Sequence, residues 1–141
     1  GLNVRTSGRR YAQAFTDYYQ PFIAKHEHML EHYLVHYAYR TQFPFGSKAV
    51  NDSLDGEARV GAFTRQYLLM AAYFAIVRAT MIGLAAHHGS AFGIDHAIRC
   101  IQSSSRTLEH CTTYAPEVLR ILGGKGIANT TSISVLTQDP R

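Results

Sequence analysis

The chain has 141 residues, of which 46% are hydrophobic and 17% charged, so it is expected to form one folded domain with its own core. This composition excludes an intrinsically disordered protein. The formal net charge of +4 favours an acidic partner or an anionic membrane surface, whereas scattered basic residues and the lack of a reader motif argue against nucleic acid.

Two helices are predicted before the first loop. Ser7 can cap a helix over residues 7–20, and Pro21 ends or kinks it because proline cannot donate a backbone hydrogen bond. A second helix is expected over 21–41, and residues 43–46, with their proline and glycine, stop it. The polar stretch that follows is rich in Gly, Ser, Asn and Asp, which predicts a loop.

The third predicted helix, over residues 55–88, is the longest and the most apolar. Spacings of four and three place one continuous seam along it: Phe63, Tyr67, Met70, Phe74, Val77, Met81 and Leu84. Its other side is apolar too, and such a helix is buried in a bundle or spans a membrane. Arg78 lies near the middle of this helix. On scales of insertion into a membrane, an arginine at the centre of a spanning helix costs about 2.5–3.5 kcal/mol. We therefore expect a buried core helix, with Arg78 paired to Glu31 or Glu109 or extended along the surface.

A fourth helix is expected over residues 91–112 and a short fifth helix over 116–122. The inward face of the fourth helix is predicted to hold Ile94, Ala97, Ile98, Ile101, Leu108 and Cys111. The predicted fold class is all-α, a helical bundle of about five helices with a long buried central helix. Residues 1–6 are expected to be a flexible arm or an expression remnant, 7–122 the domain, and 123–141 a weakly ordered tail or short docked segment.

The two cysteines, Cys100 and Cys111, are too few for a disulfide framework. They lie eleven residues apart on one predicted helix, a rise of about 16 Å that is far beyond disulfide reach. No signal peptide is recognised in the sequence. We therefore expect reduced, mostly buried thiols in a cytoplasmic protein, with membrane association left open.

Histidines recur along the second predicted helix. His28, Glu31 and His32 spell the H-x-x-E-H pattern of some zinc hydrolases, in which histidines four residues apart share a helix face. His36 extends this stripe by one turn. The sequence shows no third zinc ligand at a characteristic spacing. We therefore interpret the histidine stripe as a polar helix face, and no metal is expected. A zinc hydrolase stays open as an alternative.

A second charged group lies on the fourth predicted helix. Arg106 can reach Glu109 three residues on and His110 four residues on. The three could hold an anionic group or a partner helix, although a surface or inter-helix ion pair is the commoner role. The sequence contains no phosphate-binding loop, and the missing strands exclude a Rossmann-type methyltransferase fold.

Several short segments together resemble the C-terminal part of the flagellin lysine-N-methylases. They span about residues 18–122 in the order and spacing of that family: Leu30-Glu31-x-Tyr33-Leu34, Phe43-Pro44-Phe45, Tyr67-Leu68-Leu69, Ile82-Gly83-Leu84 and Ser105-Arg106-x-x-Glu109-His110. The resemblance implies a bacterial, cytoplasmic enzyme that transfers a methyl group from S-adenosylmethionine to lysine side chains of flagellin. It also implies an iron–sulfur cluster held by cysteines in the N-terminal part.

The chain departs from the whole enzyme because that cysteine cluster is absent, and a [4Fe–4S] cluster takes about four thiolates. It is therefore expected to be the C-terminal domain, without a cofactor of its own and inactive alone. The resemblance implies flagellin and the N-terminal cluster-bearing domain as partners, and self-association and peripheral membrane binding stay open. A stand-alone helical binding module for a protein or a membrane surface is the alternative.

The family pattern also bears on the individual residues. His32 and His36 stand where the family has asparagine, which argues against essential zinc ligands. Five positions remain as candidate catalytic residues: Glu31, Tyr33, Arg106, Glu109 and His110.

Overall fold

The part of the protein that its structure describes consists of helices joined by short turns. The computed structural model describes residues 4–44, 56–111 and 113–124. Its elements are α1 (Val4–Ala14), the π-type turn η1 (Phe15–Tyr19), α2 (Gln20–His26), α3 (His28–Arg40), α5 (Gly56–His88), the 3-10 turn η2 (Gly89–Ala91), α6 (Ile94–Ser104), the π-type turn η3 (Ser105–Glu109) and α7 (Tyr114–Gly124). The predicted all-α bundle with a long central helix is confirmed. The predicted loop and tail fall largely outside the described residues, and the proposed domain limits stay predictions.

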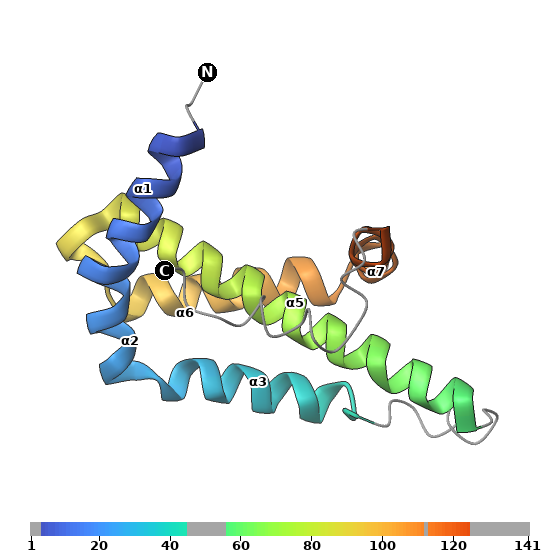
Figure 1. Ribbon diagram of the computed structural model, residues 1–141. Helices are drawn as coiled ribbons and strands as arrows, with labels where there is room; N and C mark the ends of the chain where they lie inside the picture. Colours follow the sequence, from blue (N-terminus) through green and yellow to red (C-terminus); the bar gives the residue numbers. More distant parts are fainter. Residues whose placement is uncertain (1–3, 45–55, 112, 125–141) are drawn as a thin grey trace.

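The first three elements form one continuous rod, in which the boundary expected at Pro21 falls between η1 and α2, one residue before the proline (Figure 1). In η1 the N–H of Gln20 donates to the carbonyl of Phe15, a step of five residues instead of four. This step shifts the hydrogen-bond register, and Pro21 then lies in the first turn of α2, where no N–H is needed. The single helix predicted over residues 21–41 is wrong, because the chain turns at Glu27 and α3 begins one residue later.

Helix α5 is the axis of the bundle. Figure 1 shows it running across the molecule, and it contacts the α1–η1 rod, α3, α6 and α7. By length and composition the segment 60–91 could cross a membrane, and half of its most apolar window is buried inside the bundle. The core helix of a soluble protein passes the same test, and the buried half of this window is the part that packs inside the bundle.

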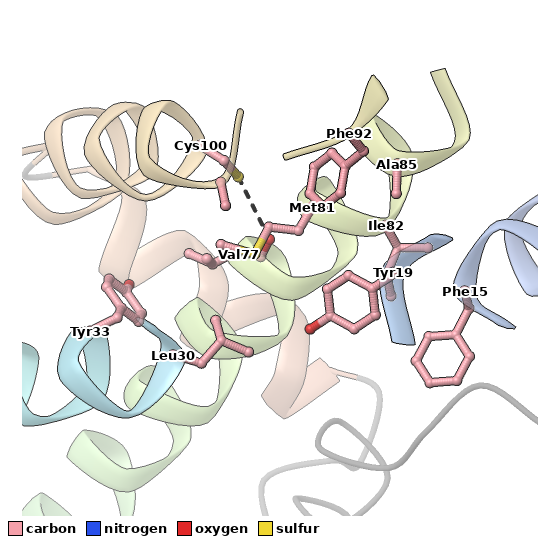
Figure 2. Packing of buried hydrophobic residues seen from close by; sticks show 11 residues of the cluster. Phe15, Tyr19, Leu30, Tyr33, Val77, Met81, Ile82, Ala85, Phe92 and Cys100 are labelled. Carbon is pink, nitrogen blue, oxygen red and sulfur yellow. Dashed lines mark hydrogen bonds between the residues drawn. The ribbon is translucent and has the colours of Figure 1, made fainter. Parts of the chain in front are cut away.

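The main core forms where α5 meets the first rod, α3 and α6. Figure 2 shows side chains of these elements converging on Val77 and Met81, both fully buried. Ala97 of α6 is fully buried as well, and its small side chain lets α6 approach α5 closely. The thiol of Cys100 points at the same place and donates to the carbonyl oxygen of Val77 at 3.8 Å. Helix α6 therefore packs on α5 through its small residues.

This packing overturns part of the predicted inward face of α6. Ile94 and Ile98 are 45% and 40% exposed, and Cys111 is exposed beyond the end of η3. Ala97 and Cys100, three residues apart, point at α5, so the isoleucines of the neighbouring edge turn away from it. The prediction that the Cys111 thiol is buried is also wrong, for a different reason: the helix ends at Glu109, before this residue.

Arg78 is accommodated by aromatic packing. It is 8% exposed, and its guanidinium carbon lies 5.7 Å from the ring centroid of Phe15, within cation–π range. Burial raises the pKa of the nearby Tyr11 hydroxyl, and the charge of Arg78 opposes that rise. Glu31, one of the predicted partners, is exposed on α3, and the side chain of Glu109 lies outside the described residues. Packing on the first rod explains how an arginine fits the middle of the apolar helix.

Candidate functional site

An open groove of about 410 Å³ lies between α3 and α6. It is lined by His26, His28, Met29, His32, Tyr33, His36, Ile94, Ile98, Ile101 and Ser105. Imidazoles form the α3 wall and isoleucines the α6 wall. Tyr33 is buried and Met29 half-buried, so these two lie deeper between the walls. The groove therefore combines an apolar side with a side rich in hydrogen-bonding rings.

The two walls follow from helical spacing. On α3 the histidines recur every four residues, which places them in a straight stripe beside the buried face of Leu30, Tyr33 and Tyr37. On α6 the isoleucines recur at spacings of four and three, next to the edge that Ala97 presents to α5. Two stripes on neighbouring helices thus face one shared channel.

The histidine stripe is a polar, exposed face. The ring centroids of His28 and His32 are 5.7 Å apart, and both side chains are exposed. Glu31 is exposed on α3 and does not line the groove. Among the described residues no group of three or more His, Cys, Asp or Glu is placed to hold a metal ion. Within that part of the chain, His28 and His32 have no third ligand of the kind a zinc hydrolase needs.

The charged group predicted around position 106 is rearranged by η3. Ser105 lines the groove, and Arg106 follows it as an exposed side chain. His110 is exposed and closes the end of η3, while the side chain of Glu109 lies outside the described residues. Because η3 is a π-type turn, residues four apart no longer stack as they do in an α-helix, and the expected contact between Arg106 and His110 does not form. Of the five candidate positions, Tyr33 alone is among the described residues that line the groove.

A second group of histidines lies where α5 passes into α6. The rings of His88 and His96 are 4.0 Å apart, and the N–H of Gly93 donates to Nδ1 of His96 at 3.2 Å. The pKa of His88 is lowered because burial disfavours the charged ring and because His96 and His87 lie close. A hollow of about 400 Å³ beside this turn is lined in part by His96 and Asp95.

The sequence as a whole matches one protein family. The family described as the FliB lysine N-methylase C-terminal domain matches residues 2–136, which is nearly the entire chain. The chain belongs to this family. No curated protein and no solved structure is significantly similar to it. The family name makes this FliB domain part of a flagellin lysine methylase, as the resemblance of the short segments implied.

The cysteines of the FliB domain do not fit an iron–sulfur cluster. Both are free, as predicted, but Cys100 is buried against α5 while Cys111 is exposed. Burial raises the pKa of Cys100, whereas hydrogen bonds from Thr113 lower the pKa of Cys111. Two thiols in such different surroundings cannot supply the roughly four thiolates that one cluster requires.

Sequence reasoning placed Ile94 and Ile98 of the FliB domain in the core and so missed one wall of the groove, whereas Ile101 is partly buried and packs against the core as predicted. The spacing of Ile94, Ile98 and Ile101 was visible, but it marks any apolar helix face, buried or exposed. The signal that could have corrected it is the edge formed by Ala97 and Cys100, whose small side chains suit close contact with α5.

Proposed function

We propose that this FliB domain supplies the flagellin-binding surface of an S-adenosylmethionine-dependent protein-lysine N-methyltransferase, and that the α3–α6 groove is this surface. The observation that carries the proposal is the groove itself, with Ile94 and Ile98 exposed along one wall. Covering apolar area of this kind is favourable by about 25 cal/mol per Å², so a partner segment gains free energy by entering.

The methyl donor is proposed to bind outside this domain. S-adenosylmethionine carries a sulfonium and an ammonium cation, which carboxylates stabilise best. No Asp or Glu stands among the described residues that line the groove. The groove therefore suits a segment of the protein substrate better than the donor, and the domain is expected to be inactive alone.

Calorimetric titration of S-adenosylmethionine into this chain and into the full-length enzyme tests the assignment of the donor. We expect heat of binding with the full-length enzyme only. Binding to both would place the donor site in these helices and would contradict the proposal, as would methylation of flagellin by this chain alone.

Substitution of one groove isoleucine in the full-length enzyme tests the role in flagellin binding. Ile98→Asp puts a charge into the apolar wall and is expected to weaken flagellin binding about tenfold or more, with donor binding unchanged. Ile121→Asp is the matched control, because Ile121 on α7 is 43% exposed, as Ile98 is 40%, and lies outside the groove. Equal effects of both substitutions would contradict the assignment.

A second surface favours docking of this domain onto the rest of the enzyme or onto a second copy. The ring of Phe43 lies 6.1 Å from that of Phe63 and 6.4 Å from that of Tyr67. Phe63 and Tyr67 are exposed in the N-terminal part of α5, beside the turn that follows α3. Phe63→Ser is expected to reduce copurification with the N-terminal part or self-association, while Tyr39→Ser, at an exposed position on α3, should leave both unchanged.

A further inference from the structure

The first turn of α6 is capped by an imidazole. Gly93 is the N-cap residue of this helix, and its N–H donates to Nδ1 of His96 at 3.2 Å. Glutamate or glutamine commonly accepts this bond from the same position of a helix. A neutral imidazole can accept it as well, but a protonated imidazole carries a hydrogen on both nitrogens and cannot. The cap of α6 therefore exists only while the ring of His96 is uncharged.

A second imidazole packs against this ring. His88 is the last residue of α5, and its ring centroid lies 4.0 Å from that of His96. Both side chains are half-buried. Burial and the charges of His96 and His87 lower the pKa of His88. Two neutral rings can stay in contact at this distance, whereas two charged rings repel each other strongly where water is partly excluded. The contact between the end of α5 and the start of α6 therefore depends on the charge of both rings.

Charged and titratable groups of both signs surround the turn. The hollow beside His96 is lined by Asp95 and His26, and the adjoining hollow beside Gly89 by Asp17, Tyr18, Lys25 and His26. His87 precedes His88 on α5, while Arg99, one turn further along α6, is exposed and lines neither hollow. Between about pH 5 and pH 8, carboxylates stay ionised and lysine, arginine and tyrosine stay protonated. Histidine is the side chain that changes charge in this range, so the response of the turn to pH comes from its imidazoles.

We propose that the His88–His96 pair is a pH-sensitive contact, which holds the first turn of α6 against the end of α5 at neutral pH and releases it in mild acid. Protonation of His96 leaves the N–H of Gly93 without its acceptor, and protonation of both rings drives the two helix ends apart. The released turn carries Ile94, which lines both the hollow beside His96 and the α3–α6 groove. One end of the groove thus changes with pH. The inference goes beyond the proposed function and stands whether or not flagellin enters the groove.

Nuclear magnetic resonance of this chain at about pH 7.5 and about pH 5.5 tests the contact. Overhauser contacts between the ring protons of His88 and His96 are expected at the higher pH only. The protection of the Gly93 N–H from hydrogen exchange should fall about fivefold or more at the lower pH, which is the usual worth of an N-terminal cap. Contacts between Cys100 and Val77 should persist at both pH values, since they belong to the main core. Ring contacts and protection that do not change would overturn the proposal, as would loss of the Cys100–Val77 contacts at the same pH.

Three variants assign the response to the cap. His96→Glu keeps an acceptor that stays ionised at both pH values, so the protection of the Gly93 N–H should be the same at both. His96→Ala removes the acceptor and should lower this protection about fivefold at the higher pH. His110→Gln is the matched control, because His110 is exposed beyond the end of η3, and it should keep the pH response of the original chain. A pH response in His96→Glu as large as in the original chain, or its disappearance in His110→Gln, would overturn the proposal.

Discussion

Two isoleucines of the same protein provide the sharpest test of the packing. Ile82 of α5 is 1% exposed in the main core, whereas Ile98 of α6 is 40% exposed on the groove. Replacement by alanine removes the same atoms at both places. The difference in the free energy of unfolding therefore measures what surrounds each side chain.

The expected magnitudes follow from burial. Ile82→Ala removes fully packed carbon atoms and leaves a cavity, so it should cost about 2–5 kcal/mol. Ile98→Ala removes a side chain that water already reaches and creates no closed cavity, and alanine is the better helix former, so it should cost about 1 kcal/mol. The free energy of unfolding of a small domain is roughly 5–15 kcal/mol, so a loss at the lower end of the range given for Ile82→Ala leaves both variants folded enough to measure.

Urea unfolding followed by far-ultraviolet circular dichroism gives the two free energies. The slope of the free energy of unfolding against urea concentration must be the same for each variant as for the original chain. A changed slope would mean that the unfolded or native state had changed. Equal losses for the two variants, or a larger loss for Ile98→Ala, would refute the burial of Ile82 between α5 and its neighbours and the exposure of the α6 isoleucines.

Three further predictions follow from particular contacts. Ala97→Leu should cost about 1–3 kcal/mol in urea unfolding because it overpacks the contact between α6 and α5, and an unchanged midpoint would contradict that contact. Iodoacetamide should modify Cys111 before Cys100 in the folded chain, which peptide mass spectrometry can follow. The Cys111 thiol is exposed and its pKa is lowered, whereas the Cys100 thiol is buried and its pKa is raised. The reverse order of modification would contradict this prediction. The pKa of His88 is lower in the folded chain than in the unfolded chain. As the pH falls, the unfolded chain therefore binds a proton before the folded chain does, and the free energy of unfolding should decrease below about pH 6.5. His88→Gln, which also removes the ring beside His96, should make this fall smaller, and an unchanged pH profile of unfolding would count against it.

The local features of the fold were readable from sequence because they depend on short-range periodicity. Apolar residues at spacings of four and three predicted the long helix α5, and the polar stripe at His28, His32 and His36 was correctly expected to be exposed. Cys100 and Cys111 are both free, as expected, although the structure places Cys111 beyond the end of the helix that was predicted to hold both. These conclusions need only the geometry of one helix.

The sequence alone does not show which face of a helix packs against which neighbouring helix. Helix α6 carries two edges that could both be buried, one with Ala97 and Cys100 and one with isoleucines, and periodicity does not choose between them. Ala97 and Cys100 lie at the contact with α5, because only small side chains allow the two helix backbones to approach each other. Ile94 and Ile98 remain exposed and line the groove. The sequence by itself determined the helices, their class and the exposed histidines, while the candidate site exists only because tertiary packing turns α6 and sets it beside α3.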